Sequence, residues 1–318
     1  MTGAGLPSRS PPRAAIARWI RRELEREPPR AKSLVVTVWG DAIAPHGGAV
    51  WLGSLIRLLA PFGLNERLVR TSVYRLTQLG WLEARQDGRR SLYRLTAAGA
   101  QRFEHAYRRI YAAPADGWDG TWEVVLAPAA RVSASQRREL RQQLRWEGFG
   151  PIAPGVLVRP SHHAGTDLAR ILTALGVERE VVTIEGRGAT GRGAEALRAY
   201  ARASWDLARV AAEYRAFLRR FGAIARQALA VRALDRQQAF LVRTLLIHAF
   251  RRVTLHDPQL PAELSPPRWP APQAYALCRD LYRVTSRAAE AHLAATLGTE
   301  HEPLRPAAPY FCRRFGGL

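Results

Sequence analysis

One stretch of the sequence, residues 65–80 (NERLVRTSVYRLTQLG), carries side chains that can hydrogen-bond to nucleic acid. When its residues are sorted at the helical period, four polar side chains share one sector and two further arginines flank it: Arg67, Thr71, Tyr74 and Gln78, with Arg70 and Arg75. Arginine and glutamine can read base edges in a DNA major groove, while threonine and tyrosine can reach phosphates or a thymine methyl group. The stretch therefore predicts a helix suited to DNA recognition.

The opposite sector of this helix is apolar, and Asn65 can cap its N-terminus. An ordinary amphipathic surface helix would show the same two sectors, because most charged helix faces are simply solvated. The helix alone does not decide between these interpretations, so its neighbours in the sequence matter. The apolar sector comprises Leu68, Val69, Val73, Leu76 and Leu79, with the small Ser72 among them.

The neighbouring segments predict a winged helix-turn-helix. Asp87-Gly88 is a strong hairpin signal, and the hairpin around it is basic. Helix, turn, helix and basic hairpin together favour DNA binding. The segments are a short helix (51–59), a turn (61–64), the recognition stretch and two strands (81–84 and 91–95). The arginines of the segment that joins the two strands are Arg85, Arg89 and Arg90.

The composition indicates a polyanionic partner. The chain has 318 residues, a formal net charge of +21 and a pI of about 11.3, and such a charge draws a protein to polyanions such as DNA. Nearly all of the positive charge is arginine, which a GC-rich genome also favours, so codon bias explains most of the arginine content. Arginine nevertheless suits bidentate contacts to guanine and phosphate.

Cysteine and hydropathy patterns argue against several other classes of protein. The two cysteines, Cys278 and Cys312, are far apart and form neither a disulfide framework nor a zinc motif. No apolar run is long enough to cross a membrane, and residues 1–13 predict a disordered tail without the apolar core of a signal peptide. We therefore expect a cytoplasmic protein with no membrane partner that, if bacterial, meets the nucleoid directly.

The rest of the N-terminal part has a largely helical pattern. Residues 14–27 predict a helix with apolar side chains on one side. Residues 33–39 indicate the first helix of the winged domain, although their β-branched side chains also permit a strand, and residues 40–48 indicate a flexible loop. Thr96 is a good N-cap for a helix over residues 97–111.

Beyond a linker at residues 114–120, the pattern changes to strands that alternate with helices. The order of elements is βαββαβ, which predicts a small ferredoxin-like domain, and an undefined α+β domain is the alternative. The strands are indicated at residues 122–126, at 152–158 (two short strands bent at Pro154-Gly155) and at 181–184, and the helices at 134–146 and 166–175.

Residues 186–191 (GRGATG) have the glycine spacing of a dinucleotide-binding loop, and Asp206 follows about 20 residues later. That site needs a second parallel strand with the acidic residue at its tip. Residues 194–234 instead show a continuous helical pattern that includes Asp206. We therefore interpret the glycines as a hinge. The C-terminal half is mostly helical, and its aromatic, histidine and arginine side chains could line a ligand cavity.

The chain resembles the PaaX family of bacterial repressors, which control phenylacetate catabolism. The resemblance rests on SLVVTVWGD (33–41), LNERLVRTSVYRLTQLGWL (64–82), GFGPIAPGVLVRP (148–160) and HDPQLPAEL (256–264). It implies an α+β multidomain fold with an N-terminal winged helix-turn-helix, a central ferredoxin-like domain similar to Cas2, and a C-terminal mainly α-helical domain. The expected boundaries are 1–30 for the N-terminal tail and helix, 31–113 for the DNA-binding domain, 118–187 for the central domain and 190–318 for the effector and dimerisation domain.

The likeness to Cas2 raises the question of metal-dependent nuclease activity. In that family an aspartate at the end of the first strand helps to bind the metal, but here the strand runs into Pro128 without one. Asp119 precedes the strand and Glu123 lies within it, so no obvious ion site is formed. We expect no metal and no nuclease activity, and a dimerisation or spacer role for this domain.

The resemblance implies a homodimer that represses by covering double-stranded promoter DNA and that is released by phenylacetyl-CoA or a related aryl-CoA. The symmetry of a dimer in turn predicts a palindromic operator. An acyl-CoA pocket needs arginines at its mouth and aromatic side chains inside. The C-terminal half offers Arg243, His248, Arg251, Arg252, His256, Trp269 and Tyr275. These residues also have an alternative interpretation, in which His248 is a histidine of the hydrophobic core and Arg251-Arg252 form the solvated end of a helix.

Two other functions remain open from the sequence. One is a winged-helix regulator with no small-molecule effector, and the other is a C-terminal domain that acts as an enzyme on a CoA thioester. Against the enzyme, the sequence shows no nucleophile elbow, no HExxH and no cysteine–histidine pairing at a recognisable spacing. The adjacent His162-His163 pair cannot by itself form a metal cage. We therefore expect no catalytic residues and no cofactor.

Overall fold

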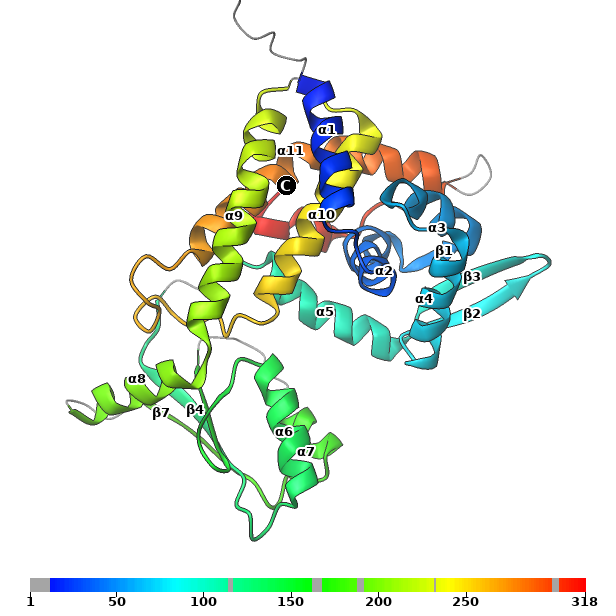
Figure 1. The fold of residues 1–318 in the computed structure, drawn as a ribbon. Coiled ribbons are helices and arrows are strands. Elements are labelled where there is room, and N and C mark those ends of the chain that lie inside the picture. Colours follow the sequence, from blue (N-terminus) through cyan, green and yellow to red (C-terminus); the bar gives the residue numbers. More distant parts are fainter. Residues whose placement is uncertain (1–11, 114–116, 162–167, 188–191, 232, 299–302) are drawn as a thin grey trace, which may run out of the picture. The chain divides into compact units, whose positions relative to one another are not determined.

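The structure is a computed structural model that describes residues 12–113, 117–161, 168–187, 192–231, 233–298 and 303–318. Three sequence predictions lie outside these residues: the N-terminal tail up to residue 11, the His162-His163 pair and the glycines within residues 188–191. Helices occur together with a three-stranded and a four-stranded sheet (Figure 1), so the predicted α+β fold is confirmed.

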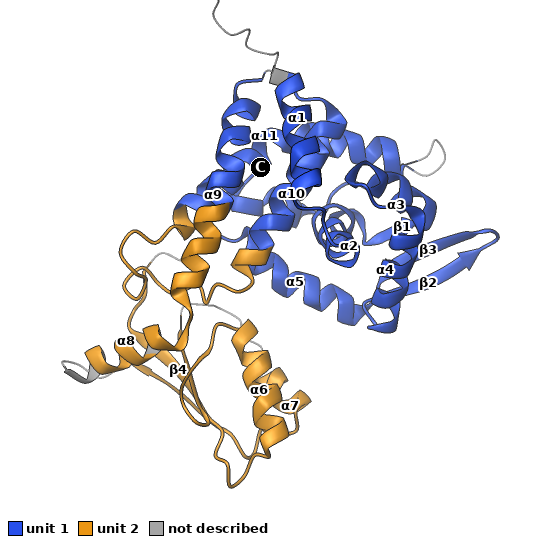
Figure 2. Cartoon of the chain, in the orientation of Figure 1, with its two compact units in different colours: residues 1–112, 217–251, 273–318 blue, residues 113–216, 252–272 orange. Residues whose placement is uncertain are grey.

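The chain forms two compact units, which Figure 2 colours separately. Unit 1 comprises residues 1–112, 217–251 and 273–318, and unit 2 comprises residues 113–216 and 252–272. The C-terminal helices therefore contribute to both units. The boundaries of the three domains expected from the sequence stay a prediction.

Unit 1 contains the predicted winged helix-turn-helix. Its strands form an antiparallel sheet in the order β1-β3-β2 (Figure 1). Residues 33–39 lie mainly in a helix, not in a strand, whereas β1 was not predicted, because three residues are too few to show an alternating pattern. The elements are α2 (Ala31–Val38), β1 (Ala49–Trp51), α3 (Leu52–Leu59), α4 (Glu66–Gln78), β2 (Leu82–Asp87), β3 (Arg90–Leu95) and α5 (Ala97–Tyr111).

Both predicted helix caps in this part are confirmed. The side-chain oxygen of Asn65 accepts a hydrogen bond from the amide of Leu68 (2.9 Å) at the start of α4. The hydroxyl of Thr96 accepts one from the amide of Gly99 (3.0 Å) at the start of α5. Each cap satisfies one of the amides that a helix leaves unpaired in its first turn.

The apolar sector of α4 is narrower than the sequence predicts. Val69, Val73 and Leu76 are buried, but the side chains of Leu68 and Leu79 are 45% and 52% exposed. At about 100° per residue, these two leucines fall at the edge of the sector that borders Arg75. The two leucines therefore extend the exposed face of the helix, although the sequence places them in its apolar sector.

The predicted hairpin is confirmed and forms the wing. Strands β2 and β3 pair in antiparallel register, with Asp87 opposite Arg90, so only Gly88 and Arg89 remain in the loop. Gly88 has φ of 53°, and a positive φ at the first central residue is what a tight two-residue loop requires.

Residues 40–48, which the sequence indicates to be a flexible loop, are helical over most of their length. A π-helical turn at Trp39–Ile43 follows α2, and a short 3-10 turn at Ala44–His46 comes next. The side chains of Trp39 and Ile43 are fully buried, and so is the carboxylate of Asp41. The prediction of a loop failed because the partners that bury this segment come from distant parts of the chain.

Unit 1 also contains helices from both ends of the chain. Trp19 of α1 contacts Phe221 of α9 (ring centroids 5.5 Å apart), and Phe62, which follows α3, contacts Phe240 of α10 (5.8 Å). The winged part and these helices therefore share one core. The additional helices, which lie wholly or mainly in this unit, are α1 (Pro12–Arg26), α9 (Leu207–Leu229), α10 (Arg236–Thr254), α11 (Ala271–Leu297) and α12 (Pro309–Cys312).

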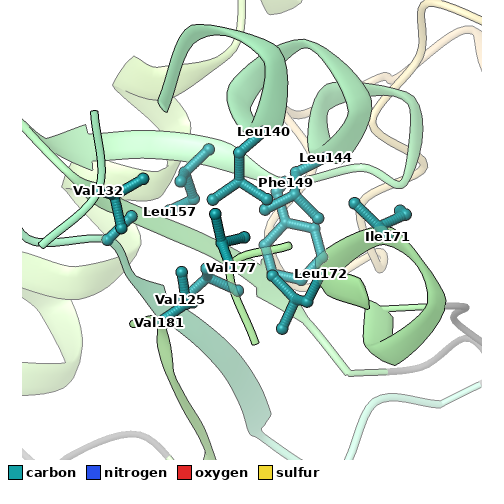
Figure 3. Packing of buried hydrophobic residues seen from close by; sticks show 11 residues of the cluster. Val125, Val132, Leu140, Leu144, Phe149, Leu157, Ile171, Leu172, Val177 and Val181 are labelled. Carbon is teal, nitrogen blue, oxygen red and sulfur yellow. The ribbon is translucent and has the colours of Figure 1, made fainter. Parts of the chain in front are cut away.

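Unit 2 contains the predicted ferredoxin-like domain. Its antiparallel sheet has the order β5-β6-β4-β7, which is the order that this topology gives to a βαββαβ chain. Helices α6 and α7 cover one face, where Leu140 and Leu144 pack with Val125, Phe149 and Leu172 (Figure 3). The elements are β4 (Thr121–Leu126), α6 (Ala134–Trp146), β5 (Gly150–Ala153), β6 (Val156–Pro160), α7 (Leu168–Ala174) and β7 (Val182–Arg187).

The helical pattern of residues 194–234 is interrupted, contrary to the prediction of one continuous helix. Helix α8 (Arg192–Ser204) ends before Trp205, and α9 begins at Leu207. Asp206 lies at this break, where its carboxylate accepts a hydrogen bond from the amide of Arg209 (3.1 Å). Because Asp206 caps α9 and does not follow a strand, the structure gives no support to a dinucleotide site.

A glycine at the start of α5 provides a test of the close packing between the wing and α5. A Cβ on Gly99 would lie 2.2 Å from the carbonyl oxygen of Trp81. We expect Gly99→Ala to lower the free energy of unfolding by about 1–3 kcal/mol, measured by urea denaturation, because the backbone must move to relieve the clash.

The matched control is Gly53→Ala on α3, where the nearest atom to the new Cβ is a guanidinium nitrogen of Arg57 at 3.9 Å. Alanine there should raise the free energy of unfolding by about 0.5–1 kcal/mol, as it ordinarily does in a helix. An equal gain for both variants would contradict the close approach of Trp81.

Candidate nucleic-acid interface

The polar face of α4 points to solvent. All six side chains predicted to contact DNA are exposed, and Tyr74 is 62% exposed: Arg67, Arg70, Thr71, Tyr74, Arg75 and Gln78. Arg70 forms an exposed ion pair with Glu66 one turn earlier (2.6 Å). Within the part of the chain that the structure describes, no ion pair holds Arg67 or Arg75. Their charges are therefore available to a ligand in solution.

The three predicted arginines of the wing, Arg85, Arg89 and Arg90, are exposed around a turn that side-chain hydrogen bonds hold in place. The side-chain amide of Gln86 donates to the carbonyl of Gly88 (3.0 Å), and its oxygen accepts from the hydroxyl of Ser91 (2.9 Å). These bonds hold the tip of the hairpin in one conformation. The three arginines therefore extend from a defined surface.

The wing is tied to the C-terminus of α4. The amide of Trp81 donates to the carbonyl of Leu76 (3.0 Å), and the hydroxyl of Thr96 donates to the carbonyl of Gly80 (2.6 Å). On its other side, α4 packs against α2 and α3. The recognition helix and the wing are thus fixed relative to each other, as simultaneous contact with one duplex requires.

Behind this surface lies a buried ionic group, here called the Asp41 cluster: Asp41, Arg243, Arg314, Tyr111 and Tyr282. A guanidinium nitrogen of Arg314 lies 3.0 Å from Oδ1 of Asp41, and Nε of Arg243 lies 3.2 Å from Oδ2. The hydroxyls of Tyr111 and Tyr282 donate to Oδ1 (2.7 and 2.9 Å). Burial raises the pKa of both tyrosines, which keeps these hydroxyls protonated.

The members of the Asp41 cluster come from five segments of unit 1. Asp41 follows α2, Tyr111 ends α5, Arg243 belongs to α10, Tyr282 to α11 and Arg314 to the C-terminal tail. Both arginines are fully buried. The cluster therefore joins the first helix of the winged part to the C-terminal helices through charges that have no contact with water.

A second carboxylate extends this network. Glu290 of α11 pairs with Arg243 (2.6 Å) and with Nε2 of His46 (2.9 Å), and Nδ1 of His46 lies 2.6 Å from the carbonyl oxygen of Arg305. Both ring nitrogens of His46 therefore lie within hydrogen-bond distance of an oxygen atom. Burial alone raises the pKa of Glu290, but the His46 hydrogen bond and Arg243 outweigh it and lower this pKa to about 2.

Three of the predicted ligand-binding residues are engaged in internal contacts of unit 1. Arg243 belongs to the Asp41 cluster. Nδ1 of His248 lies 2.8 Å from the hydroxyl of Thr37, and Arg251 donates to the same hydroxyl (3.0 Å) and to the carbonyl of Ser33 (3.5 Å). Burial lowers the pKa of Arg251. These contacts connect α10 to α2.

The other four predicted ligand-binding residues are divided between the two units. Tyr275 lies in unit 1, where its ring contacts Phe315 (5.5 Å) and burial raises its pKa. Arg252, His256 and Trp269 lie in unit 2. Arg252 and His256 are exposed, and Nδ1 of His256 lies 2.6 Å from the carbonyl oxygen of Arg252. The ring of Trp269 packs against the ring of Tyr214. Neither unit contains all seven residues, so this ligand site stays a prediction.

The two carboxylates considered for a metal in the central domain have other partners. Asp119 accepts hydrogen bonds from the amide and hydroxyl of Thr121 (3.0 and 2.8 Å). Glu123 forms a bidentate pair with the buried Arg159 (2.8 Å). Among the described residues, no group of three or more histidine, cysteine, aspartate or glutamate side chains could hold a metal ion.

Sequence reasoning missed four residues that hold the DNA-binding part in place: Asp41, His46, Glu290 and Arg314. Asp41 lies inside the motif VWGD, but neither spacing nor periodicity links it to partners more than 200 residues away. On a separate point, none of the helices that the structure describes is long and apolar enough to cross a bilayer. The missed residues are structural, and the residues that the sequence predicts to contact DNA are exposed.

Comparison with known proteins gives consistent matches over most of the chain. Family profiles described as PaaX-like protein, PaaX protein central Cas2-like domain and PaaX-like protein C-terminal domain match residues 30–99, 115–198 and 205–295. The transcriptional repressor PaaX of Escherichia coli K12 is 34% identical over 303 residues, which is 94% of each chain. The solved structure of uncharacterized protein Rv0674 from Mycobacterium tuberculosis is similar (TM-score 0.51, 25% identity, 84% of this chain and 98% of that one).

The Glu290 pairing predicts a stability change at acidic pH. Its pKa falls from an ordinary 4.5 to about 2 in the folded protein, so the folded state favours the charged form. The pairing therefore adds on the order of 3 kcal/mol to the free energy of unfolding. This contribution is fully present above pH 4.5 and is lost as the pH falls toward 2. We expect Glu290→Gln to be less stable than the parent at pH 6, and the difference to shrink between pH 5 and pH 2.

The measurement is the free energy of unfolding from denaturant titrations across this pH range. Glu25→Gln, which removes an exposed carboxylate from α1, is the control for the loss of one charge. A difference between Glu290→Gln and the parent that stays constant from pH 6 to pH 2 would show that the Glu290 pairing does not contribute as described.

Proposed function

The chain belongs to the PaaX family of transcriptional regulators, and from that membership we propose that it is a repressor that binds double-stranded DNA through α4 and the β2–β3 wing. It is a regulator and not an enzyme. The observation that carries the proposal is the solvent-facing polar sector of α4, held rigidly beside a basic hairpin.

In the proposed complex, α4 lies in a major groove. Arg67, Thr71, Tyr74 and Gln78 face the base edges, where arginine and glutamine can form bidentate hydrogen bonds with guanine and adenine. Arg75 and Arg70 contact phosphates, and Arg70 exchanges its exposed Glu66 partner for a phosphate at little cost. Arg85, Arg89 and Arg90 of the wing contact the adjacent backbone or minor groove.

A homodimer would place two copies of α4 in successive major grooves of a palindromic operator, about 34 Å apart. Because the curated relative is named a transcriptional repressor and the family resemblance points to phenylacetate catabolism, we place the operator before genes for aromatic-ring breakdown. This assignment locates the protein in the cytoplasm, at the nucleoid.

The effector in this proposal is phenylacetyl-CoA or a related aryl-CoA. A CoA ester carries phosphates that arginines can bind and an acyl end that suits aromatic side chains. Of the predicted ligand residues, Arg252, His256 and Trp269 supply these types within unit 2, and Tyr275 lies in unit 1. The effector would act by binding the DNA-incompetent state of the dimer more tightly. The alternative is a regulator with no small-molecule effector.

Two single substitutions separate base reading from phosphate contact. We expect Arg67→Ala to weaken operator binding by about 1–3 kcal/mol and to relax specificity at one base position. We expect Arg89→Ala to weaken binding to all sequences alike and to reduce the slope of log affinity against log salt by about 0.9. Gel-shift or fluorescence titrations on operator and scrambled duplexes at several salt concentrations measure both effects.

Arg219→Ala, which removes an exposed arginine from α9, is the matched control for loss of one positive charge. It should leave operator specificity unchanged. If Arg67→Ala, Arg89→Ala and Arg219→Ala all bind like the parent, α4 and the wing do not form the DNA interface.

The effector assignment gives a separate test. At 100 times its dissociation constant, phenylacetyl-CoA should stabilise the protein by about 2.7 kcal/mol in a thermal-shift experiment and should lower its affinity for the operator. CoA without an acyl group is the control for binding through phosphates alone. An unchanged melting temperature together with unchanged operator affinity would reject this effector and leave the DNA-binding proposal intact.

A further inference from the structure

Helix α6 of the central domain carries a row of arginines that the proposed DNA contacts do not use. Arg138, Arg141 and Arg145 are exposed and are spaced by three and four residues, so they lie along one side of the helix. The opposite side, with Leu140 and Leu144, is buried against the sheet (Figure 3). We call Arg138, Arg141 and Arg145 the α6 arginine row.

The α6 arginine row is not neutralised by neighbouring acidic groups. Within the described residues, no ion pair or hydrogen bond engages its three guanidinium groups. The one carboxylate on this helix, Glu139, accepts a hydrogen bond from Gln143 (3.1 Å), at the spacing of one turn. Some other exposed arginines of the chain do pair within their own helix, such as Arg108 with Glu104 and Arg209 with Glu213.

The dimensions of the α6 arginine row fit the backbone of a duplex. Seven residues of helix span about 10 Å, and each DNA strand presents one phosphate per about 3.4 Å of axis. Three guanidinium groups along such a span can reach two or three successive phosphates. Arginine forms bidentate hydrogen bonds with phosphate, and no base edge has to be read.

We infer that the α6 arginine row is a second, sequence-independent DNA-binding surface, which contacts phosphates of the duplex that flanks the operator. This inference rests on the proposed function and gives the central domain a role other than that of a spacer. The recognition helix then supplies specificity, and the central domain adds affinity that depends on the length of the duplex and on salt.

The test compares two duplexes, a minimal operator that covers the half-sites alone and the same operator extended by about 20 base pairs of unrelated sequence on each side. The operator is first isolated by selecting bound fragments with the parent protein. The parent should bind the extended duplex more tightly. The triple variant Arg138→Ala/Arg141→Ala/Arg145→Ala should bind it about 10- to 100-fold more weakly, with a salt slope reduced by about 2–3, and should bind the minimal duplex like the parent.

Two further variants control for charge and folding. Arg215→Ala/Arg219→Ala/Arg226→Ala removes three exposed arginines from α9 and should bind the extended duplex like the parent. Arg138→Lys/Arg141→Lys/Arg145→Lys keeps the charge of the row and should keep most of the salt slope. Alanine and lysine are both favourable on a helix surface, so circular dichroism should show folded proteins in each case.

The outcomes separate this inference from the proposed function. If the alanine triple variant on α6 binds both duplexes like the parent, the α6 surface does not contact DNA, while α4 and the wing keep their role. If both triple variants weaken binding equally, the effect is one of net charge and the inference is overturned. If the parent selects no fragment over random DNA, the proposed function fails and the inference with it.

Discussion

The carboxylate of Asp41 is paired with two arginines in a place that water does not reach, and the arrangement of unit 1 depends on this contact. Removing three charged groups from water costs several kcal/mol for each ion, and their mutual attraction offsets this cost only when all of them are present. Asp41 follows the first helix of the winged part, whereas Arg243 and Arg314 belong to the C-terminal half. Separating the two parts would leave buried charges unpaired, so they fold as one body.

This connection bears on how a signal could reach the DNA-binding surface. Helix α4 packs on α2, and α2 leads directly into the turn that carries Asp41. Helix α10 contacts the same region twice, through Arg243 at Asp41 and through His248 and Arg251 at Thr37. A displacement of α10 would therefore reach α2 through direct contacts within one compact unit.

Local signals in the sequence were enough to predict most elements of the winged part and of the central domain. The Asn65 cap, the Gly88 turn and the succession of helices and strands in the central domain depend on residues close together in the chain. The π-helical turn around Asp41 depends on Arg314, 273 positions away, and no periodicity carries that information. The same limit applied at Asp206, where a break between two helices was predicted as continuous helix because the flanking residues favour helix on both sides.

The arginines of this protein serve two distinct purposes, which explains why the net charge of +21 alone did not define the function. Arg243 and Arg314, and likewise Arg159 of the central domain, are buried beside carboxylates and add little to the external field. Each buried pair contributes no net charge, so the excess of 48 basic over 27 acidic residues must lie mainly at the surface. In the proposed function, DNA affinity depends on the distribution of unpaired surface arginines on α4, the wing and α6, and not on the arginine content as a whole.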